Sequence, residues 1–196
     1  MKLLQIERDA LLKPLQAVTG IVEKRHTLPI LSNVLVERKD GGLKLVATDL
    51  EIQVSTRCDA GKGSADQSLT VSARKLQDIL RSLPDGTDVA LDAQNSRLQV
   101  KAGKSRFNLQ TLPAADFPLL GDAGAPLAKV TLPQKELREL LLLVQFSMAQ
   151  QDIRYYLNGM LLVLEDDQIR VVATDGHRLS YASGQVARQD EKREVI

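Results

Sequence analysis

The chain has 196 residues, 43% of them hydrophobic and 3% aromatic, with a formal net charge of +1. This composition predicts a folded protein with a mainly aliphatic core and excludes a generally disordered chain. The charge balance lacks the strongly basic character of a typical DNA-binding domain, so a nucleic-acid role requires positive charge gathered on one surface.

Cysteine content and hydropathy narrow the class of protein further. Cys58 is the only cysteine, which excludes an intrachain disulfide and a multi-cysteine metal site and fits a reducing environment. The longest uninterrupted aliphatic run, residues 140–144, is far too short to span a membrane. The N-terminal segment is charged and lacks a cleavage site, so we expect no signal peptide and a cytoplasmic location.

The N-terminal part of the chain predicts one strand, one helix and three further strands. Apolar side chains recur at helical spacing from Arg8 to about Thr19, although Pro14 lies within that pattern. After a bend at Asp49, apolar and polar residues alternate, as in a strand with one solvent-facing side. The expected elements are a strand at 2–6, the helix at 8–19 and strands at 30–38, 43–48 and 50–55.

The same order of elements is predicted a second time directly afterwards. A helical pattern places Leu76, Ile79, Leu80 and Leu83 on one side, and a Pro-Asp-Gly turn ends it. The region therefore reads as two copies of a strand-helix-strand-strand-strand unit. The expected elements are a strand at 67–72, the helix at 73–83 and strands at 88–93, 97–102 and 105–112.

A stretch rich in proline and glycine, residues 112–128, has the composition of a linker. Beyond it we expect a strand at 129–132, a helix at 134–146 and further strands from residue 160 onward. The sequence therefore predicts two domains, residues 1–125 and 126–196.

The tetrapeptide VATD occurs twice, at 46–49 and at 172–175, which fixes an offset of 126 residues. At that offset the flanking apolar positions also match without a gap. An ungapped match of this length indicates one domain-sized unit used twice. The matched pairs include Leu11 with Leu137, Leu15 with Leu141, Val18 with Val144, Leu31 with Leu157 and Leu35 with Leu161.

Ile196, at the end of the sequence, corresponds to Thr70 of the first copy. A second copy that stops there lacks half of its expected sheet. We therefore expect either a fragment of a longer protein or a partner that covers the exposed sheet edge.

The candidate catalytic motifs in the sequence are weak. Asp175, His177 and Ser180 suggest a hydrolase, but they fall on one predicted hairpin, where strand alternation sends His177 and Ser180 to opposite faces. The segment GKGS at 61–64 lacks the rest of a phosphate-binding loop. The acidic run at 165–167 is better explained as a solvated hairpin tip, and we expect no metal site.

Basic residues are more informative, because several helices can each offer cations to one polyanion. Arg74 and Arg81 lie seven residues apart, on one side of the second helix, and Lys13 is placed similarly on the first. Lys24 and Arg25 follow in the next loop. Phosphate contacts of this kind give affinity without sequence preference, although an ordinary solvated helix face carries such residues too.

Two features of the second copy leave alternatives open. Tyr155 and Tyr156 either are partly buried under the sheet or stack on exposed bases. The hairpin around VATDGHRL either belongs to the core or forms one wall of a groove that grips a short hydrophobic peptide.

Five segments together resemble the bacterial DNA polymerase III beta subunit family, the sliding clamps. They are LLKPLQAV, TLPILSNVL, TLPAADFP, QFSMAQQDIRYYLNGML and VATDGHRL. The resemblance covers nearly the whole chain, apart from residues 59–67 and the last ten, which are less typical.

The resemblance implies an α+β clamp fold with three similar domains per protomer, each of two strand-helix-strand-strand-strand halves. Two protomers would close head to tail into a ring, with helices toward the hole and sheets outside. This chain would hold the first domain, part of the second and none of the third. A near-neutral chain fits such a ring if cations face the hole and carboxylates face outward.

The implied function is that of a processivity factor without catalytic residues or cofactors. The ring would encircle duplex DNA regardless of sequence and tether the polymerase of the DNA polymerase III holoenzyme. The implied DNA contacts are Arg25, Arg74, Gln151, Tyr155 and Tyr156. The implied cleft for short hydrophobic peptides of the polymerase and clamp loader comprises Arg154, Leu157, Thr174, Gly176, His177, Arg178 and Leu179. The implied homodimer interface lies near Arg106, Phe107 and Leu109.

Overall fold

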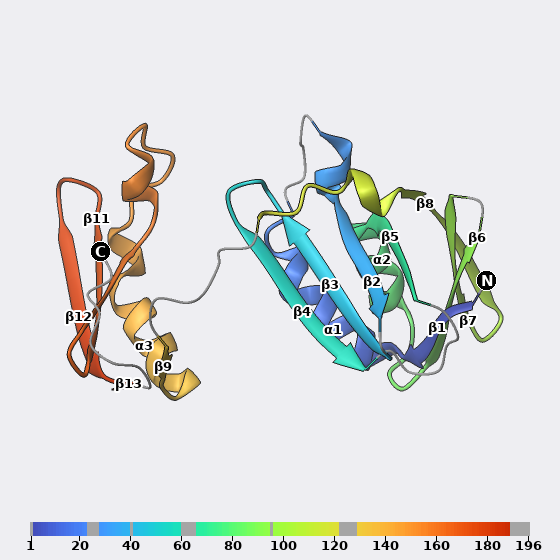
Figure 1. Ribbon diagram of the computed structural model, residues 1–196, viewed down its shortest axis with the longest axis horizontal. Helices are drawn as coiled ribbons and strands as arrows, with labels where there is room; N and C mark the ends of the chain where they lie inside the picture. Colours follow the sequence, from blue (N-terminus) through green and yellow to red (C-terminus); the bar gives the residue numbers. More distant parts are fainter. Residues whose placement is uncertain are drawn as a thin grey trace. The chain divides into compact units, whose positions relative to one another are not determined.

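The protein is described by a computed structural model over residues 2–22, 28–39, 41–59, 66–94, 96–121 and 129–188. Contacts divide the chain into two compact units, Met1–Gly121 and Asp122–Ile196, which we call unit 1 and unit 2 (Figure 1). Among the described residues, no helix has the length and apolar character needed to cross a membrane.

Unit 1 runs twice through the order strand, helix, strand, strand, strand, which confirms the inner repeat predicted from the sequence. The first pass comprises β1 (Lys2–Glu7), α1 (Arg8–Thr19), β2 (Asn33–Lys39), β3 (Gly42–Thr48) and β4 (Gln53–Asp59). The second pass comprises β5 (Gln67–Ser72), α2 (Ala73–Ser82), β6 (Asp88–Gln94), β7 (Arg97–Ala102) and β8 (Ser105–Leu112). Two 3-10 turns, η1 (Pro29–Ser32) and η2 (Ala114–Asp116), flank them.

The two passes exchange their first strands. The sheet has the order β1-β6-β7-β8-β5-β2-β3-β4. β1 pairs with β6 of the second pass, and β5 pairs with β2 of the first. Each half therefore completes the sheet of the other, and the two halves interlock.

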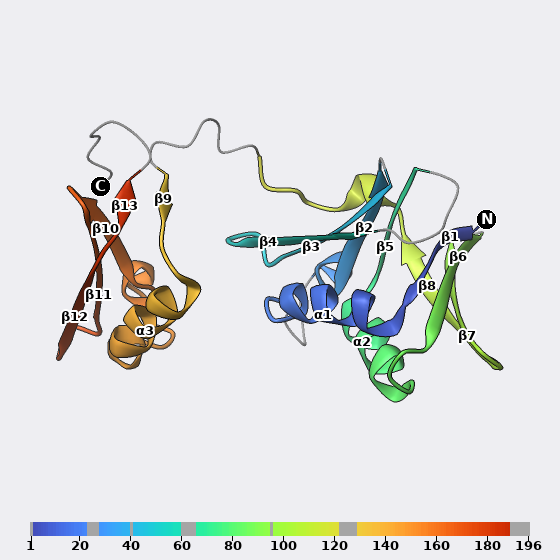
Figure 2. The same cartoon turned by 90° about the horizontal axis from the view of Figure 1, so that it is seen from below.

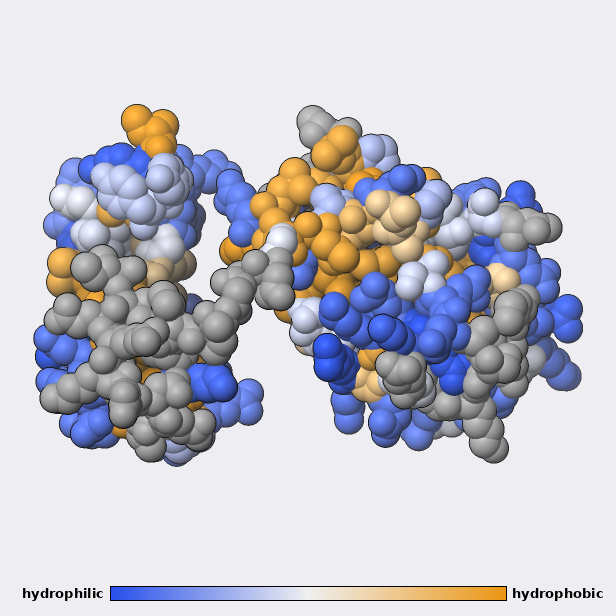
Figure 3. All heavy atoms as spheres, viewed as in Figure 1, coloured by the Kyte–Doolittle hydropathy of each residue, from blue (hydrophilic) through white to orange (hydrophobic). Residues whose placement is uncertain are grey.

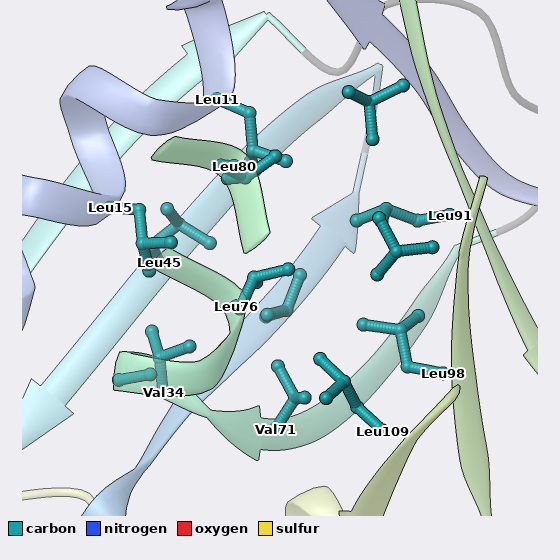
Figure 4. Packing of buried hydrophobic residues seen from close by; sticks show 14 of the residues in the cluster. Leu11, Leu15, Val34, Leu45, Val71, Leu76, Leu80, Leu91, Leu98 and Leu109 are labelled. Carbon is teal, nitrogen blue, oxygen red and sulfur yellow. The ribbon is translucent and has the colours of Figure 1, made fainter. Parts of the chain in front are cut away.

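Both helices of unit 1 lie on one face of the sheet (Figure 2). α1 packs against β3 and β4, α2 packs against β2, β5 and β8, and the two helices contact each other. The side chains of Leu11, Leu15, Leu76 and Leu80 are at most 1% exposed and point into the aliphatic core beneath them (Figure 4). Because the apolar side of each helix is buried, its polar side faces away from the sheet.

A smaller core lies on the other face of the sheet. Leu35 of β2 and Val46 of β3 are buried there against Phe117, with Ile30 and Ala114 packed around them. The turns η1 and η2 thus cover part of the face that the helices leave free.

Unit 2 repeats one pass of the same order. It comprises β9 (Val130–Thr131), α3 (Gln134–Val144), β10 (Leu161–Glu165), β11 (Gln168–Thr174), β12 (Leu179–Gln185) and β13 (Ala187–Arg188), with 3-10 turns η3 (Gln145–Ser147) and η4 (Tyr155–Asn158). β10, β11 and β12 form one antiparallel sheet, and β13 pairs with β9. α3 packs against β11 and β12 through Leu140 and Val144.

Four predicted boundaries differ from the structure by two or more residues. The strand predicted to end at residue 55 continues to Asp59, and the other three boundaries differ for local reasons. The strand predicted at 30–38 begins at Asn33, because η1 starts at Pro29, whose fixed φ suits the first residue of a helical turn. The strand predicted at 50–55 begins at Gln53, because Leu50 adopts φ +80 in a turn. The helix predicted to end at residue 146 ends at Val144 and continues as η3. β13 was not predicted.

We expect Leu15→Ala to lower the free energy of unfolding by about 2–5 kcal/mol, because it leaves a cavity between α1 and the sheet. Leu15 is 0% exposed. Urea denaturation followed by circular dichroism measures the change. Gln16→Ala, on the exposed side of the same helix, is the matched control, and its effect should stay within about 0.5 kcal/mol. Equal effects of the two variants would contradict the described packing.

Candidate functional site

The turn between β11 and β12 is built on two side chains of the repeated VATD motif. The Thr174 hydroxyl donates to the carbonyl of Arg178 at 2.6 Å and accepts from the N–H of Gly176 at 3.1 Å. Asp175 Oδ1 accepts from the N–H groups of His177 and Arg178, each at 2.9 Å. These bonds hold the pKa of Asp175 below its usual range. The turn is therefore held in one conformation by charged and neutral hydrogen bonds.

The segment between η3 and η4 is organised around Asp152. Its carboxylate accepts from the backbone N–H of Arg154 at 2.8 Å, from Nε at 3.0 Å and from Nη2 at 2.9 Å. Asn158 accepts from the N–H of Asp152 and donates to its carbonyl, both at 3.0 Å. A short surface loop is thus fixed by a fork of hydrogen bonds to one guanidinium.

Arg154 joins this loop to the turn. A side chain at Gly176 would place its Cβ 3.3 Å from Arg154 Nη1, and Gly176 has φ +90. Both facts favour glycine at this position, because other residues rarely adopt that φ and a Cβ would crowd the guanidinium. Arg178 pairs with Asp175 through Nε at 3.0 Å and lies 5.8 Å from the centre of the Phe146 ring.

A hollow of about 470 Å³ lies between the loop and the turn. Three candidate cleft residues, Arg154, His177 and Arg178, line it, and so do Phe146 and the DNA candidate Gln151. Leu157, Thr174, Gly176 and Leu179 are not among the residues that line it. The cleft candidates therefore divide into three that line a polar hollow and four that lie outside it, among them the exposed Leu179.

The structure contradicts one of the two alternatives for the tyrosine pair, burial under the sheet. Tyr155 and Tyr156 are 83% and 66% exposed, so they are not buried under the sheet. Their rings meet edge to face at a centroid distance of 5.9 Å. Exposed tyrosines supply flat apolar surfaces with a polar tip, which suits contact with bases or sugars.

The positions of Asp175 and Ser180 do not support the hydrolase hypothesis. The hydroxyl of Ser180 lies 2.6 Å from the hydroxyl of Ser147. The Asp175 carboxylate accepts hydrogen bonds from the backbone of the turn and from the guanidinium of Arg178. Within the described parts of the chain, no cluster of three or more His, Cys, Asp or Glu residues could hold a metal ion.

In unit 1, α1 and α2 together carry five Lys or Arg residues and two Asp residues. Lys13, Arg74 and Arg81 are exposed, as expected. Arg74 donates to the carbonyl of Val22 at 2.6 Å, next to the segment that contains Arg25, and Arg25 itself lies outside the described residues. The strands of unit 1 carry eight Lys or Arg and five Asp or Glu, so the positive excess is not confined to the helices.

The interface candidates lie on β8, which pairs with β7 from Ser105 to Gln110 and with β5 only at Thr111 and Leu112. Among the described strands, the rest of that edge is open. Arg106 is exposed and Phe107 is half-buried, whereas Leu109 is 7% exposed and belongs to the core of unit 1. Leu109 would therefore meet a partner mainly through its backbone.

Sequence reasoning missed Asp152, Phe146 and Ile153. Asp152 organises the loop, Phe146 lies beside Arg178, and Ile153 is 98% exposed at the loop tip. The position of Asp152, two residues before Arg154, is the signal that could have revealed its role, because Asp side chains often accept a hydrogen bond from the backbone N–H two residues later. In a loop, where no periodicity is present, no sequence pattern distinguishes an exposed Ile from a buried one.

Comparisons with known proteins agree on one family. The description "DNA polymerase III beta subunit, N-terminal domain" matches residues 1–121, and "DNA polymerase III beta subunit, central domain" matches residues 131–196. The chain is 47% identical to the beta sliding clamp of Escherichia coli (strain K12), over 97% of this chain and 52% of that protein. The chain thus spans about half the length of the curated relatives it matches.

Solved structures give the same result. The chain resembles the DNA polymerase III subunit beta of Pseudomonas aeruginosa with a TM-score of 0.89 and 45% identity, over 98% of this chain and 52% of that one. It resembles the Caulobacter crescentus pol III beta with a TM-score of 0.85 and 40% identity, over 94% of this chain and 50% of that one. Another P. aeruginosa structure, with a TM-score of 0.86 and 47% identity over 93% of this chain and 49% of that one, is bound to griselimycin.

We expect the ion pair of Asp152 and Arg154 to persist to unusually low pH. The hydrogen bonds from the Arg154 side chain lower the pKa of Asp152 from 3.8 to about 2. A lowered pKa stabilises the folded loop above pH 3.8, and this contribution is lost as the pH falls through about 2. Carboxyl-carbon NMR titration of Asp152 measures the midpoint, and a midpoint near the ordinary value would contradict the described pairing.

Asp152→Asn should remove this pH dependence and speed amide hydrogen exchange across the 152–158 loop, because an amide offers one acceptor oxygen in place of two. Asp167→Asn, at the turn between β10 and β11, makes the same charge change away from the loop. Equal exchange rates in the two variants would count against the role of Asp152.

Proposed function

This chain belongs to the DNA polymerase III beta subunit family, the beta sliding clamps, and from that premise we propose that it serves in a processivity clamp. In this proposal a ring of clamp domains encircles duplex DNA and tethers the replicative polymerase, as an accessory subunit that catalyses no reaction itself. Retention comes from topology, so each contact with DNA can be weak. A polymerase that releases the primer end stays nearby at high effective concentration.

The observation that carries the proposal is the one-sided packing of α1 and α2. Their apolar sides are buried against the sheet, and their exposed residues include four cations, Lys13, Arg74, Lys75 and Arg81, against one carboxylate, Asp78. The fifth cation, Arg8, has a side chain only 12% exposed and pairs with Asp9 and Asp85. Cations on helix surfaces contact phosphates without reading base sequence, and salt screens these contacts at separations beyond about 8–10 Å. We infer that this face, together with Arg25 and the loop bearing Gln151, Tyr155 and Tyr156, contacts the duplex.

The turn of unit 2 supports a second part of the proposal, a cleft for short hydrophobic peptides. Leu179 is 66% exposed beside a turn that hydrogen bonds hold in place, and Leu157 belongs to the adjoining η4. Arg154 and Arg178 add positive charge at its edge, and His177 adds a polar ring. Such a site combines an apolar anchor with polar groups that orient the ligand. We propose that tail segments of the polymerase and clamp loader bind here.

The remaining parts of the proposal concern assembly and location. The open edge of β8, with Arg106, Phe107 and the backbone of Leu109, is the surface we propose for pairing between protomers of a homodimeric ring. Unpaired strand edges are ready templates for pairing with another chain. We further propose that the protein works in the cytoplasm, where the chromosomal DNA of bacteria lies.

We expect Arg74→Glu and Arg81→Glu each to weaken binding of duplex DNA to the chain and to reduce the slope of log affinity against log salt by about one to two. Both replace a phosphate-facing cation by an anion, and Arg81→Glu does so without disturbing the bond from Arg74 to Val22. Fluorescence anisotropy with duplexes of unrelated sequence, at several salt concentrations, measures both effects. The loss should be equal for all sequences.

Arg57→Glu is the matched control, because Arg57 is exposed and alternates with Val54 and Cys58, which pack toward the helices. It makes the same change in net charge on the opposite face of the sheet. An equal loss of affinity in the control would show that net charge alone governs binding and would contradict the proposed face.

A further inference from the structure

The turn between β11 and β12 of unit 2 is repeated in unit 1 by the turn between β3 and β4. At the offset of 126 residues, η1 corresponds to η4, β3 to β11 and β4 to β12 with identical boundaries. The strand registers also agree, because Leu35 pairs with Val46 as Leu161 pairs with Val172. Unit 1 therefore contains the scaffold on which the proposed peptide cleft of unit 2 is built.

The correspondence extends to individual hydrogen bonds. The Thr48 hydroxyl donates to the carbonyl of Ile52 at 2.8 Å and accepts from the N–H of Leu50 at 3.0 Å. Asp49 Oδ1 accepts from the N–H of Glu51 at 3.0 Å and from that of Ile52 at 2.7 Å. These four bonds repeat those of Thr174 and Asp175 in unit 2.

The side chains on this shared scaffold differ in chemistry. Unit 1 places Leu28, Leu50, Glu51 and Ile52 where unit 2 places Arg154, Gly176, His177 and Arg178. Cationic and small residues of unit 2 are thus replaced by apolar and acidic ones.

The backbone conformation of Leu50 is unusual for a leucine. Its φ of +80 lies in the region that favours glycine, which is the residue unit 2 uses at the same place with φ +90. Side chains other than those of glycine and asparagine are disfavoured in this region. Yet the Leu50 side chain is 45% exposed, so burial within the unit does not fully account for its presence.

Apolar side chains gather on one surface of unit 1, which extends over η1, the turn between β3 and β4 and the segment at 113–120 (Figure 3). Leu28, Leu50, Ile52, Leu119 and Leu120 are between 39% and 57% exposed. The small core of Leu35, Val46 and Phe117 lies on the same face of the sheet, the face that the helices leave free. We call this surface the unit 1 apolar face. Contiguous exposed apolar surface of this kind marks interaction sites in soluble proteins.

The segments that form the unit 1 apolar face carry only negative charges among their described residues. Asp49, Glu51 and Asp116 belong to the segments that form it. The described residues of those segments, 28–32, 48–53 and 112–121, contain no Lys or Arg. A ligand that covers the apolar residues therefore gains from cationic groups at its ends.

We propose that the unit 1 apolar face is a second peptide-docking surface, which takes a short apolar segment of a partner protein flanked by Lys or Arg. The kind of occupant rests on the proposed function of the unit 2 turn, and the preference for basic flanks rests on the acidic surroundings in unit 1. The two surfaces would then sort partner segments by the sign of their flanking charges.

Two synthetic peptides test this proposal on the full 196-residue chain, one with the apolar core Leu-Phe-Leu flanked by lysines and the other with the same core flanked by glutamates. We expect the lysine-flanked peptide to bind about tenfold more tightly to the unit 1 apolar face than the glutamate-flanked peptide. Ile52→Glu and Leu50→Gly should each weaken binding of the lysine-flanked peptide by about tenfold. Glycine at position 50 suits the backbone there, so Leu50→Gly keeps the turn intact. Fluorescence anisotropy measures affinity, and NMR shifts in the 48–53 segment locate the site.

Leu143→Ser, which removes a similarly exposed leucine from α3, is the matched control and should leave binding unchanged. Leu179→Ser tests the unit 2 site separately, so failure of that site is distinguishable from failure of this proposal. The proposal is overturned if neither Ile52→Glu nor Leu50→Gly affects the lysine-flanked peptide, or if both peptides bind equally. It is also overturned if light scattering shows that a second copy of the chain occupies the face and that Ile52→Glu releases it.

Discussion

The one-sided burial of α1 and α2 determines most of what this chain presents to its surroundings. Leu15 and Leu76 are completely buried against the sheet, so the opposite sides of the helices must face solvent. The strand exchange between the two halves holds the helices beside each other on that face. Under the proposed function, a rigidly held cationic surface that contacts phosphates singly would retain DNA and still let the protein move along it.

Duplication supplies the second organising constraint. One turn, fixed by a Thr hydroxyl and an Asp carboxylate, appears in both units with the same four hydrogen bonds. Because the backbone is held by these two side chains, the remaining positions of the turn are free to differ. Unit 2 uses that freedom for cations and glycine, and unit 1 uses it for apolar and acidic residues. A repeated scaffold can thus carry two recognition surfaces of opposite charge.

Periodicity and the VATD repeat predicted the order of elements and the inner repeat of unit 1, because buried apolar faces leave a regular trace in sequence. The same reasoning extended strands through Leu50 and Ile30, since alternation does not reveal a positive φ or a 3-10 turn. Sequence could not place the exposed Tyr155, the buried Leu109 or the fork between Asp152 and Arg154. Those properties depend on which distant segments pack nearby.

Lysine acetylation footprinting, with and without duplex DNA at low salt, tests the central claim most directly. The helix face carries Lys13 and Lys75, whereas Lys44 lies on the opposite face of the sheet and Lys104 in the turn between β7 and β8. The account predicts that duplex DNA slows acetylation of Lys13 and Lys75 and leaves Lys44 and Lys104 unchanged. Protection of Lys44 with no protection of Lys13 and Lys75 would contradict it.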